Sequence, residues 1–520
     1  IKDLDHFHIY NSHQNKHLIT HIIVSSHFYV NHYNIVQKQP QHQQPILFGL
    51  SITTPEDPLI LATELPLSIK YFKYTTVSQR LTKEYLPQTI TSLYIDISVS
   101  IDQIPKSVKT LTIDSSYQSK RDEKRLENMK FHHLSQLLPP SLTKFQFNDF
   151  SHKAKIDFNL NQMPPNLTYL AIFGDFTFTG NGNGSLKYLK LNTKVSDRPY
   201  LIPTSVTQLK MTTPSINSTL LPPNLNHLEY NFIGLHGETA TAPNKFPEKL
   251  TTLSLKNCSF TNISKNNWPS SVLDYRNWSE QSEKDVPYLP PSLTKARLSI
   301  HNDMKEFPIL PSSLIELKMV STRRFETFAG PSPLHSYFPN TIVKLALEYS
   351  DELFIGLIPT SVTDLKLHYS KPIPKGAIPN SVTKLHLFNS SSDLAKPIVI
   401  PNSVTYLNFE FERQLYPELE IPDSVKTLKI KYMEFLKITP FLNYFKTTFK
   451  NITRFSTRSS IYKKIKLIVE KLRDKKLFPN LKQINVVGGN YHFTDQNMVY
   501  KEVDYKSNSV GSSNFKNKYK

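Results

Sequence analysis

Cysteine and glycine are both scarce in this chain of 520 residues, and each scarcity excludes a class of structure. The single cysteine, Cys258, rules out a disulfide framework within the chain and fits a reducing compartment. Only 13 glycines stand beside 37 prolines, a balance that argues against flexible linkers and favours stiff, recurring turns.

Long apolar runs are missing as well. No stretch reaches the roughly 18 apolar residues of a membrane span, and the N-terminal stretch holds no apolar run of the signal-peptide kind. The chain is nevertheless 38% hydrophobic, with 26 tyrosines and 31 phenylalanines, which is enough to build a core. We therefore expect a folded, monomeric protein of the cytoplasm, or of the nucleus, without a transmembrane span.

The motifs that accompany catalysis are absent from the sequence. It shows no glycine-rich phosphate loop, no metal-ligand spacing and no nucleophile motif. Cys258 lacks the His and Asn motif that accompanies a catalytic thiol, so we interpret it as a buried turn residue. We expect a protein that is not an enzyme and carries no cofactor.

Acidic residues are too few to balance the basic ones. The chain has 62 Lys and Arg against 43 Asp and Glu, a formal net charge of +19. Residues 436–520 alone hold 18 Lys and Arg against 5 Asp and Glu. The body of the chain is therefore close to balance, and the C-terminal end carries most of the positive charge.

A repeat occupies most of the chain. Each copy reads apolar-Pro-x-[Ser/Thr]-[Val/Leu/Ile]-x-x-Leu-x-[Leu/Ile/Phe], most often at spacings of 20 to 22 residues. Residues 185–191 form a worn copy, which has lost its proline but keeps the apolar spacing. The anchor prolines of the other sixteen copies are Pro66, Pro87, Pro105, Pro139, Pro164, Pro203, Pro222, Pro247, Pro269, Pro290, Pro311, Pro339, Pro359, Pro379, Pro401 and Pro422.

The apolar positions of each copy predict a strand. After Pro379 they are Val382, Leu385 and Leu387, and the spacing of two between the leucines is strand alternation. The frame L-x-x-L-x-L is that of a leucine-rich repeat. One such strand cannot bury its apolar face alone, so the copies should stack. We predict a right-handed, leucine-rich-repeat-like solenoid with one short parallel strand per turn of about 21 residues, and few helices except at the ends.

The polar positions of the repeat have structural interpretations. Proline fixes φ and donates no hydrogen bond, so it suits the turn that enters the strand. Two residues later stands Ser or Thr in 13 of the 16 copies, Asn in two more and Lys249 in the last. Such short side chains can satisfy backbone groups that a turn leaves unpaired.

One copy resembles a known family. "KPIPKGAIPNSVTKL" at Lys371–Leu385 is similar to the FNIP repeat, a leucine-rich-repeat-like unit found in social amoebae, and "IPNSVTYL" at Ile400–Leu407 matches it in shorter form. The Phe-Asn pair that names the family is absent before Pro372, and only Gly356 and Gly376 keep the glycine three residues before the anchor proline. The resemblance, over about residues 65–430, implies a divergent member, a solenoid and a binding role, with no catalytic residues to carry over.

The N-terminal segment, 1–45, differs from the repeats and holds eight of the 18 histidines. Helical spacing over 15–24 would place His13, His17 and His21 on one face. Three histidines so placed could hold a metal ion, although a polar face in a His-, Gln- and Asn-rich sequence explains them as well. The FNIP resemblance also implies that this segment could be a degenerate F-box-like module, which would recruit a ubiquitin-ligase adaptor.

The other segments follow from the same pattern. We expect the solenoid over 46–435, with a charged, helix-like insertion at 115–137 and a loop at 321–337. Longer turns should follow over 436–490, with strands at 451–457 and 481–486. Between them, residues 459–476 predict an amphipathic helix that caps the solenoid. Its basic face could bind nucleic acid or acidic lipid, or could simply be solvated. Residues 491–520 are a tail, disordered from 505.

Two columns of basic residues suggest a binding face. We define the middle column as the seventh residue after each anchor proline and the first column as the fifth. Both should point away from the core on the sheet face, where basic residues outnumber acidic ones by 11 to 4. The candidate binding residues are Lys73, Lys210, Arg276, Arg297, Lys318, Lys366, His386 and Lys429 in the middle column, and Lys344 and Lys384 in the first column.

Two functions follow as hypotheses. The first is a non-catalytic scaffold whose solenoid surface binds another protein with an acidic surface, in one version as the substrate receptor of a ubiquitin ligase. The second is a polyanion-binding protein that uses the basic C-terminal end and the sheet face to hold RNA, DNA or acidic lipid. No known nucleic-acid-binding motif supports the second.

Overall fold

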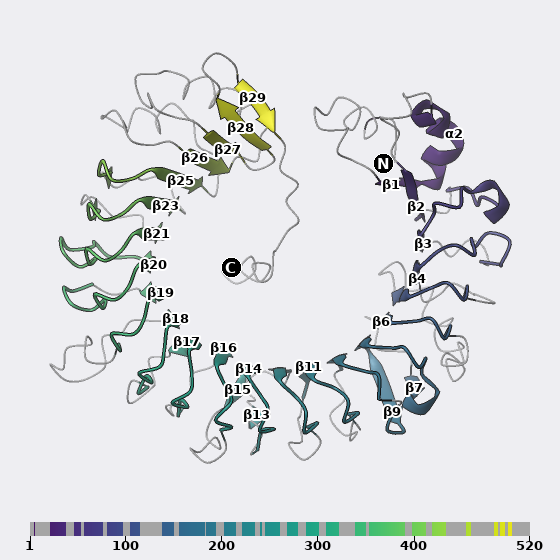
Figure 1. The fold of residues 1–520 in the computed structure, drawn as a ribbon, viewed down its shortest axis with the longest axis horizontal. Helices are drawn as coiled ribbons and strands as arrows, with labels where there is room; N and C mark the ends of the chain where they lie inside the picture. Colours follow the sequence, from purple (N-terminus) through teal and green to yellow (C-terminus); the bar gives the residue numbers. More distant parts are fainter. Residues whose placement is uncertain are drawn as a thin grey trace. The chain divides into compact units, whose positions relative to one another are not determined.

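A computed structural model shows two compact units, Ile1–Leu314 and Ile315–Lys520, built from the same repeat (Figure 1). Within each unit, the long sheet lies on the inner side and the connecting segments lie outside it. The structure describes residues 5, 21–37, 46–53, 57–75, 81–96, 104–114, 138–149, 155–182, 184–193, 202–214, 221–233, 240–241, 245–259, 268–278, 288–300, 308–321, 338–349, 353–389, 398–411, 419–432, 454–458, 483–486, 489–493 and 498–501.

The first unit is a parallel sheet in which consecutive copies pair side by side. Leu189 of the worn copy, for example, stands between Leu170 and Leu209 of its neighbours, so the copy keeps its place in the stack. The strands, in spatial order, are β1 (His21–Ser25), β2 (Ile46–Ile52), β3 (Tyr71–Tyr74), β4 (Ser92–Asp96), β5 (Thr110–Asp114), β6 (Lys144–Asn148), β8 (Tyr169–Phe173), β10 (Tyr188–Asn192), β11 (Gln208–Thr213), β12 (His227–Phe232), β14 (Thr252–Lys256), β16 (Asp274–Trp278) and β17 (Lys295–Ile300).

The second unit repeats this arrangement and ends differently. Its last two strands pair antiparallel, so the sheet closes with a meander rather than another turn. The strands are β18 (Glu316–Ser321), β19 (Lys344–Tyr349), β20 (Asp364–Tyr369), β21 (Lys384–Asn389), β23 (Tyr406–Phe411), β25 (Thr427–Tyr432), β26 (Arg454–Arg458), β27 (Gln483–Val486), β28 (Gly489–Phe493) and β29 (Met498–Lys501).

Among the described residues, little regular structure lies outside the long sheet of each unit. Three short parallel pairs form on the connecting segments. They are β7 (Lys155–Asn159) with β9 (Asp175–Thr179), β13 (Ala240–Thr241) with β15 (Cys258–Ser259), and β22 (Ile398–Val399) with β24 (Leu419–Glu420). The described helical elements are α2 (Ser26–Gln37), η3 (Ala62–Glu64) and η5 (Leu160–Gln162). The predicted solenoid of parallel strands with few helices is confirmed.

The core consists of the three apolar columns of the repeat. Val382 and Leu385 are completely buried and Leu387 almost so, and the same positions are buried in turn after turn. Along β20 the residues alternate strictly between buried leucine and outward-facing polar side chains. Each buried Leu or Val stabilises the fold by about 1.5 to 3 kcal/mol, so stability grows with the number of stacked turns.

The anchor proline opens a tight turn in all sixteen copies. Its carbonyl accepts a hydrogen bond from the N–H three residues later, as Pro379 does from Val382 at 3.1 Å. The chain thereby reverses just before the strand, and the apolar residue that ends the turn enters the core. Proline is suited to this place because its own nitrogen needs no acceptor.

The Ser/Thr column joins each turn to the one before it. Ser381 Oγ donates to the Val362 carbonyl at 2.7 Å, and Ser403 Oγ donates to the Val382 carbonyl at 2.8 Å. The acceptor therefore lies about 20 residues back in the chain, in the preceding turn rather than in the serine's own. The Thr363 carbonyl, just before β20, accepts the backbone N–H groups of Thr383 and Lys384 in the next turn, and also the Thr383 hydroxyl.

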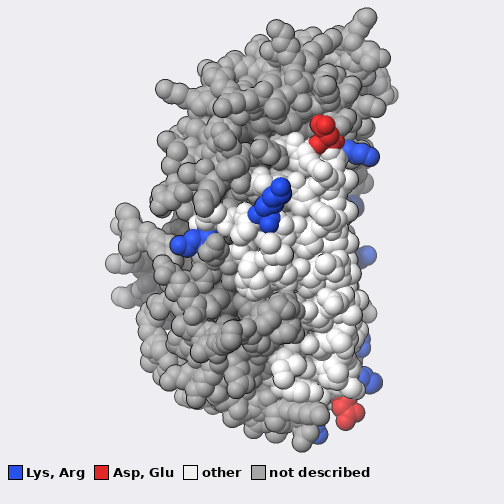
Figure 2. Space-filling model, turned by 90° about the vertical axis from the view of Figure 1, so that its left-hand side faces the viewer, with Lys and Arg blue, Asp and Glu red and all other residues white. Residues whose placement is uncertain are grey.

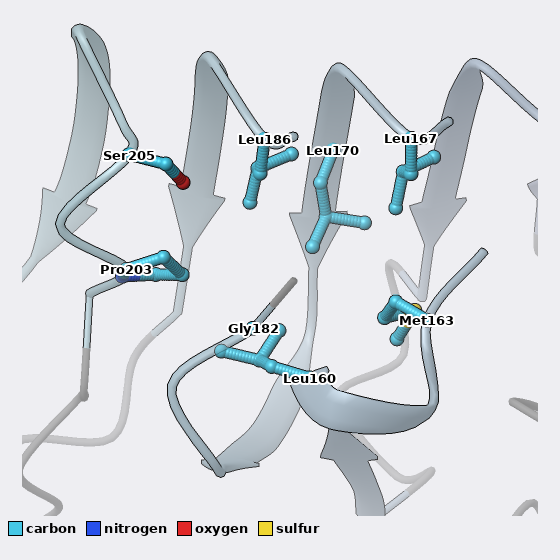
Figure 3. Close-up of a pocket in the computed structure, with 8 residues that line it drawn as sticks. All are labelled: Leu160, Met163, Leu167, Leu170, Gly182, Leu186, Pro203 and Ser205. Atoms are coloured by element: carbon cyan, nitrogen blue, oxygen red, sulfur yellow. The ribbon is translucent and has the colours of Figure 1, made fainter. Parts of the chain in front are cut away.

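Ser205, in the copy that follows the worn one, departs from this pattern. Its hydroxyl is buried and has no hydrogen-bond partner among the residues that the structure describes. In Figure 3 it points into a small cavity beside Leu186. The cavity encloses about 10 Å³, room for one water molecule at most, so it is a packing defect and not a ligand site. Its lining residues are Leu160, Met163, Leu167, Leu170, Gly182, Leu186, Pro203 and Ser205.

We expect unequal costs from removing two serine hydroxyls of this column. Ser381→Ala should lower the free energy of unfolding by about 1 kcal/mol, because it leaves a carbonyl of the preceding turn unpaired. Ser205→Ala should leave that free energy unchanged or raise it slightly, because the lost hydroxyl has no protein partner. Urea unfolding of both variants measures the difference, and equal losses would contradict this account of the column.

Gly356 and Gly376, the glycines that support the FNIP resemblance, have a specific conformational role. Both adopt positive φ, +90° and +85°, which residues with a Cβ rarely adopt. Each is the third residue of a turn, closed in the second case by a hydrogen bond from Ala377 N–H to the Pro374 carbonyl. Glycine at that place is typical of a type II turn.

The structure corrects the helix predicted over 15–24. His21–Ser25 forms strand β1 and pairs in parallel with β2, so His21 does not lie on a helical face with His13 and His17. Ile22, Ile23 and Val24 are β-branched in succession, which favours a strand over a helix. A helix, α2, begins only afterwards, where Ser25 Oγ accepts from the Phe28 N–H at 3.1 Å and caps it. His13 and His17 lie outside the described residues.

Several other predicted segments lie outside the described residues as well. These are the insertions at 115–137 and 321–337, the helix at 459–476 and the end of the chain from 505. The strands predicted at 451–457 and 481–486 are present as β26 and β27. Residues 491–493 and 498–501, expected to be part of a tail, belong to β28 and β29 of the sheet.

Candidate functional site

Strand alternation places the middle and first columns on the sheet face, away from the core. In β20 the middle-column residue Lys366 is exposed, while Leu365 and Leu367 on either side are buried. The ten candidate residues all lie on this face, at matching positions of neighbouring strands, and each is exposed or half-buried. These residues differ in whether a neighbouring carboxylate or aromatic ring already interacts with the charged group.

In the first unit, neighbouring groups occupy most of the candidate cations. Lys210 Nζ lies 2.6 Å from a Glu229 oxygen, and Arg276 lies 2.7 Å from Asp274. The Lys73 ammonium lies over the ring of Tyr94, 4.8 Å from its centre. Arg297, too, interacts with other groups. Two of the four candidate charges in this part, those of Lys210 and Arg276, are therefore balanced by carboxylates within the sheet face itself.

In the second unit, two of the candidate lysines are similarly engaged. Lys344 Nζ lies 2.6 Å from Glu316, and Lys318 Nζ lies 3.7 Å from Glu348. Each pair bridges adjacent strands, β18 and β19, so acidic residues of one turn offset basic residues of the next. These partly exposed pairs stabilise the sheet by about 1 kcal/mol at most, but they leave little net charge for a ligand.

Three lysines further along the same face have no such partner. Lys366, Lys384 and Lys429 form no ion pair or hydrogen bond within the described part of the chain. They surround His386, whose strand β21 lies between β20 and β23, with β25 beyond. We refer to Lys366, Lys384, Lys429 and His386 as the lysine cluster.

The centre of the lysine cluster is built from side chains in contact. Asn408 Nδ2 lies 3.1 Å from His386 Nδ1, and the Tyr406 ring lies 5.2 Å from the imidazole. Burial, with the added effect of the Lys366 charge, lowers the pKa of His386 to about 4. The imidazole is therefore neutral at pH 7. Its Nδ1 accepts from the Asn408 amide, and its Nε2 carries the proton.

Sequence reasoning missed the neutral members of this site. Tyr406 and Asn408 occupy the first and middle columns of β23. Both are uncharged, so a count of basic and acidic residues did not include them. Phe388 and His368 lie beside them in the next outward-facing column, with rings 4.3 Å apart and nearly perpendicular. Comparing all the side chains of each column across neighbouring copies, and not the charged ones alone, would have revealed these aromatic rings and this amide.

Figure 2 shows the side of the molecule that lies on the left in Figure 1. The described surface on this side is mostly uncharged, and most of the visible charged side chains are basic; several lie along one edge and others lie on the face itself. No cluster of His, Cys, Asp and Glu suited to a metal ion occurs among the described residues. None of the described helices has the length and apolar character needed to cross a bilayer.

Cys258 is fully buried, as predicted, in the two-residue strand β15. Its Sγ lies 3.3 Å from the Lys256 carbonyl, to which the thiol donates. The preceding residue, Asn257, adopts a positive φ of 56°, which turns the chain out of β14. These surroundings are those of a structural cysteine in a turn.

Comparison with known proteins found similarity to one repeat family and to two solved structures. The FNIP Repeat family matches residues 369–412, which contain β21 and β23. A comparison with curated proteins gave no match. The circular leucine-rich-repeat protein CroV588 is 18% identical, with a TM-score of 0.49, over 85% of this chain and 69% of its own. YopM from Yersinia enterocolitica is 16% identical, with a TM-score of 0.36, over 83% of this chain and 92% of its own. The similarity to the FNIP Repeat family thus covers residues 369–412, within a sheet built from successive copies of one repeat.

Proposed function

We propose that the protein is a non-catalytic scaffold that binds an acidic surface of another protein through the sheet face of its second unit. The observation that carries this proposal is the lysine cluster, in which three ammonium groups stand on rigid neighbouring strands without a carboxylate partner. Like charges at strand spacing repel one another, so the arrangement costs free energy unless a ligand offsets it.

Two further observations support a binding role over a catalytic one. Leucine-rich-repeat solenoids commonly serve as protein-interaction scaffolds through the surface formed by their stacked repeats. The cavity beside Ser205 is too small for a substrate. Tyr406 and Phe388 flank the cluster, and half-buried aromatic side chains are typical anchors of protein interfaces.

Charge reversal in the lysine cluster should weaken binding of an acidic probe. The variant Lys366→Glu/Lys429→Glu is expected to bind a fluorescent Glu- and Asp-rich peptide at least about tenfold more weakly at low salt. Its remaining binding should depend less on salt concentration, because fewer charge contacts are left to screen. Fluorescence anisotropy at two salt concentrations measures both effects.

The matched control is Lys371→Glu/Lys375→Glu, which changes the net charge equally at exposed lysines of the turn between β20 and β21. It should bind the probe almost as the unchanged protein does. Equal losses in both variants would show that only net charge matters and would remove the site from the sheet face. Tighter binding of an oligonucleotide than of the acidic peptide would favour the polyanion-binding function instead.

The finer version of this function makes the protein a ubiquitin-ligase substrate receptor, with residues 1–45 binding the adaptor. Deleting residues 1–20 should then abolish capture of a purified adaptor while leaving β1, the melting curve and acidic-peptide binding intact. Unchanged adaptor capture, or none by the full chain, would contradict this version without affecting the scaffold role.

A further inference from the structure

The lysine cluster offers a more specific site than a general positive surface. In the middle column, Lys366, His386, Asn408 and Lys429 stand directly side by side on four consecutive strands. At a strand spacing of about 4.8 Å, the two lysines are about 14 Å apart at their backbones. Their long side chains can therefore reach toward each other over His386 and Asn408, while Lys384 approaches from the first column.

The charge of this site is not balanced locally. Asp364 is the carboxylate that acts on His386 most directly, against three lysines, which leaves an excess of two positive charges. Glu316 and Glu348 are held by Lys344 and Lys318. Glu410, two residues after Asn408, interacts with other groups as well. A ligand that matches the site should therefore carry roughly two negative charges on one compact group.

The floor of the site adds hydrogen-bonding groups to this charge. With Nδ1 accepting from Asn408, the neutral imidazole of His386 presents its Nε2–H as a donor. The site thus combines the ammonium groups with an N–H donor beside them, which suits an anionic side chain on a peptide.

We propose that the lysine cluster binds a phosphorylated serine or threonine within an acidic segment of the partner protein. This inference rests on the proposed scaffold function. A phosphate ester carries a charge of about −1.5 to −2 at pH 7 and three terminal oxygens that accept hydrogen bonds. It matches both the excess charge and the number of donors, whereas a carboxylate supplies one charge and two oxygens.

The test compares three peptides that differ at one position within the same acidic sequence: phosphoserine, glutamate or serine. We expect the phosphoserine peptide to bind the full chain about tenfold or more tightly than the glutamate peptide, by isothermal titration calorimetry. Lys366→Gln/Lys429→Gln should remove this preference. Lys344→Gln, on the same face but with its ammonium held by Glu316, should keep it. Melting curves of both variants establish that they are folded.

Each alternative outcome has a distinct meaning. Equal binding of the phosphoserine and glutamate peptides would overturn the phosphate site while leaving the acidic-partner function in place. Failure of all three peptides to bind would overturn both. A shift of the His386 ring resonances in the NMR spectrum with the phosphoserine peptide alone is expected, because the phosphate should contact Nε2–H. Stronger binding of a decauridylate RNA, lost in the double variant, would assign the cluster to nucleic-acid phosphates and overturn the phosphopeptide proposal.

Discussion

Leu385→Asp is expected to lower the free energy of unfolding of the second unit by at least about 4 kcal/mol, the combined effect of lost apolar burial and an unpaired buried charge. Leu385 is completely buried at the centre of β21, between Leu365 and Leu407 of the adjacent strands. A carboxylate there finds no polar partner, because the apolar columns continue on both sides. Thermal melting followed by circular dichroism should show a large fall in the transition temperature.

The control for this variant lies one residue away. Lys384→Asp introduces the same side chain on the same strand but at an exposed position, so its melting temperature should change little. Similar melting temperatures for the two variants would mean that β21 does not bury alternate residues. The repeat register deduced from Pro379 would then be wrong.

Acid should destabilise the second unit well above the pH at which carboxylates protonate. Burial is the main cause that lowers the pKa of both His368 and His386 to about 4, assisted by Lys318 and Lys366 respectively. In the unfolded chain both imidazoles have their ordinary pKa of about 6.5. As the pH falls from 6.5 toward 4, the unfolded state therefore binds protons first, and stability is lost over this interval.

We expect a loss of about 1 kcal/mol per histidine between pH 7 and pH 5, allowing for solvent screening at these partly exposed rings. Urea unfolding at several pH values measures it. Besides the lysines, the charged groups that act on the two imidazoles include Asp364, which opposes the effect at His386. In the variant His368→Gln/His386→Gln the curve of stability against pH should be flatter over this range. Parallel curves for the variant and the unchanged protein would show that other groups cause the acid sensitivity.

The repeat could be predicted from sequence because its signal is local and recurs many times. A spacing of three, three and two after each anchor proline is enough to place Val382, Leu385 and Leu387 in the core. The role of the serine column could be predicted only in part. The chemistry of serine predicts that its hydroxyl satisfies a backbone group. The acceptor, however, lies in the preceding turn, and the sequence of one copy does not show which carbonyl of the neighbouring copy lies beside the serine.

The candidate site was less predictable for a different reason. The column of basic residues could be found from the sequence, but whether each charge is balanced depends on pairs between strands. Lys318 and Glu348 lie 30 positions apart in the chain, in different columns of adjacent turns. The burial of His386 and its contact with Asn408 likewise need the stacked structure. At the N-terminus, the β-branched residues at 22–24 outweighed the helical spacing of the histidines.

Because each strand pairs with the strand of the preceding turn, the segment that connects two turns can lengthen without changing how they pair. Thr110 of β5 pairs directly with Lys144 of β6, although their connection is longer than most, and the register of the sheet passes unbroken across it. Each doubling of a connection's length costs only about 0.6 kcal/mol in closure entropy. New sequence can therefore be spliced in after a strand without disturbing the turns on either side. Evolution could vary the outer segments of the protein while keeping its sheet face, and a protein engineer could insert a reporter domain there for the same reason.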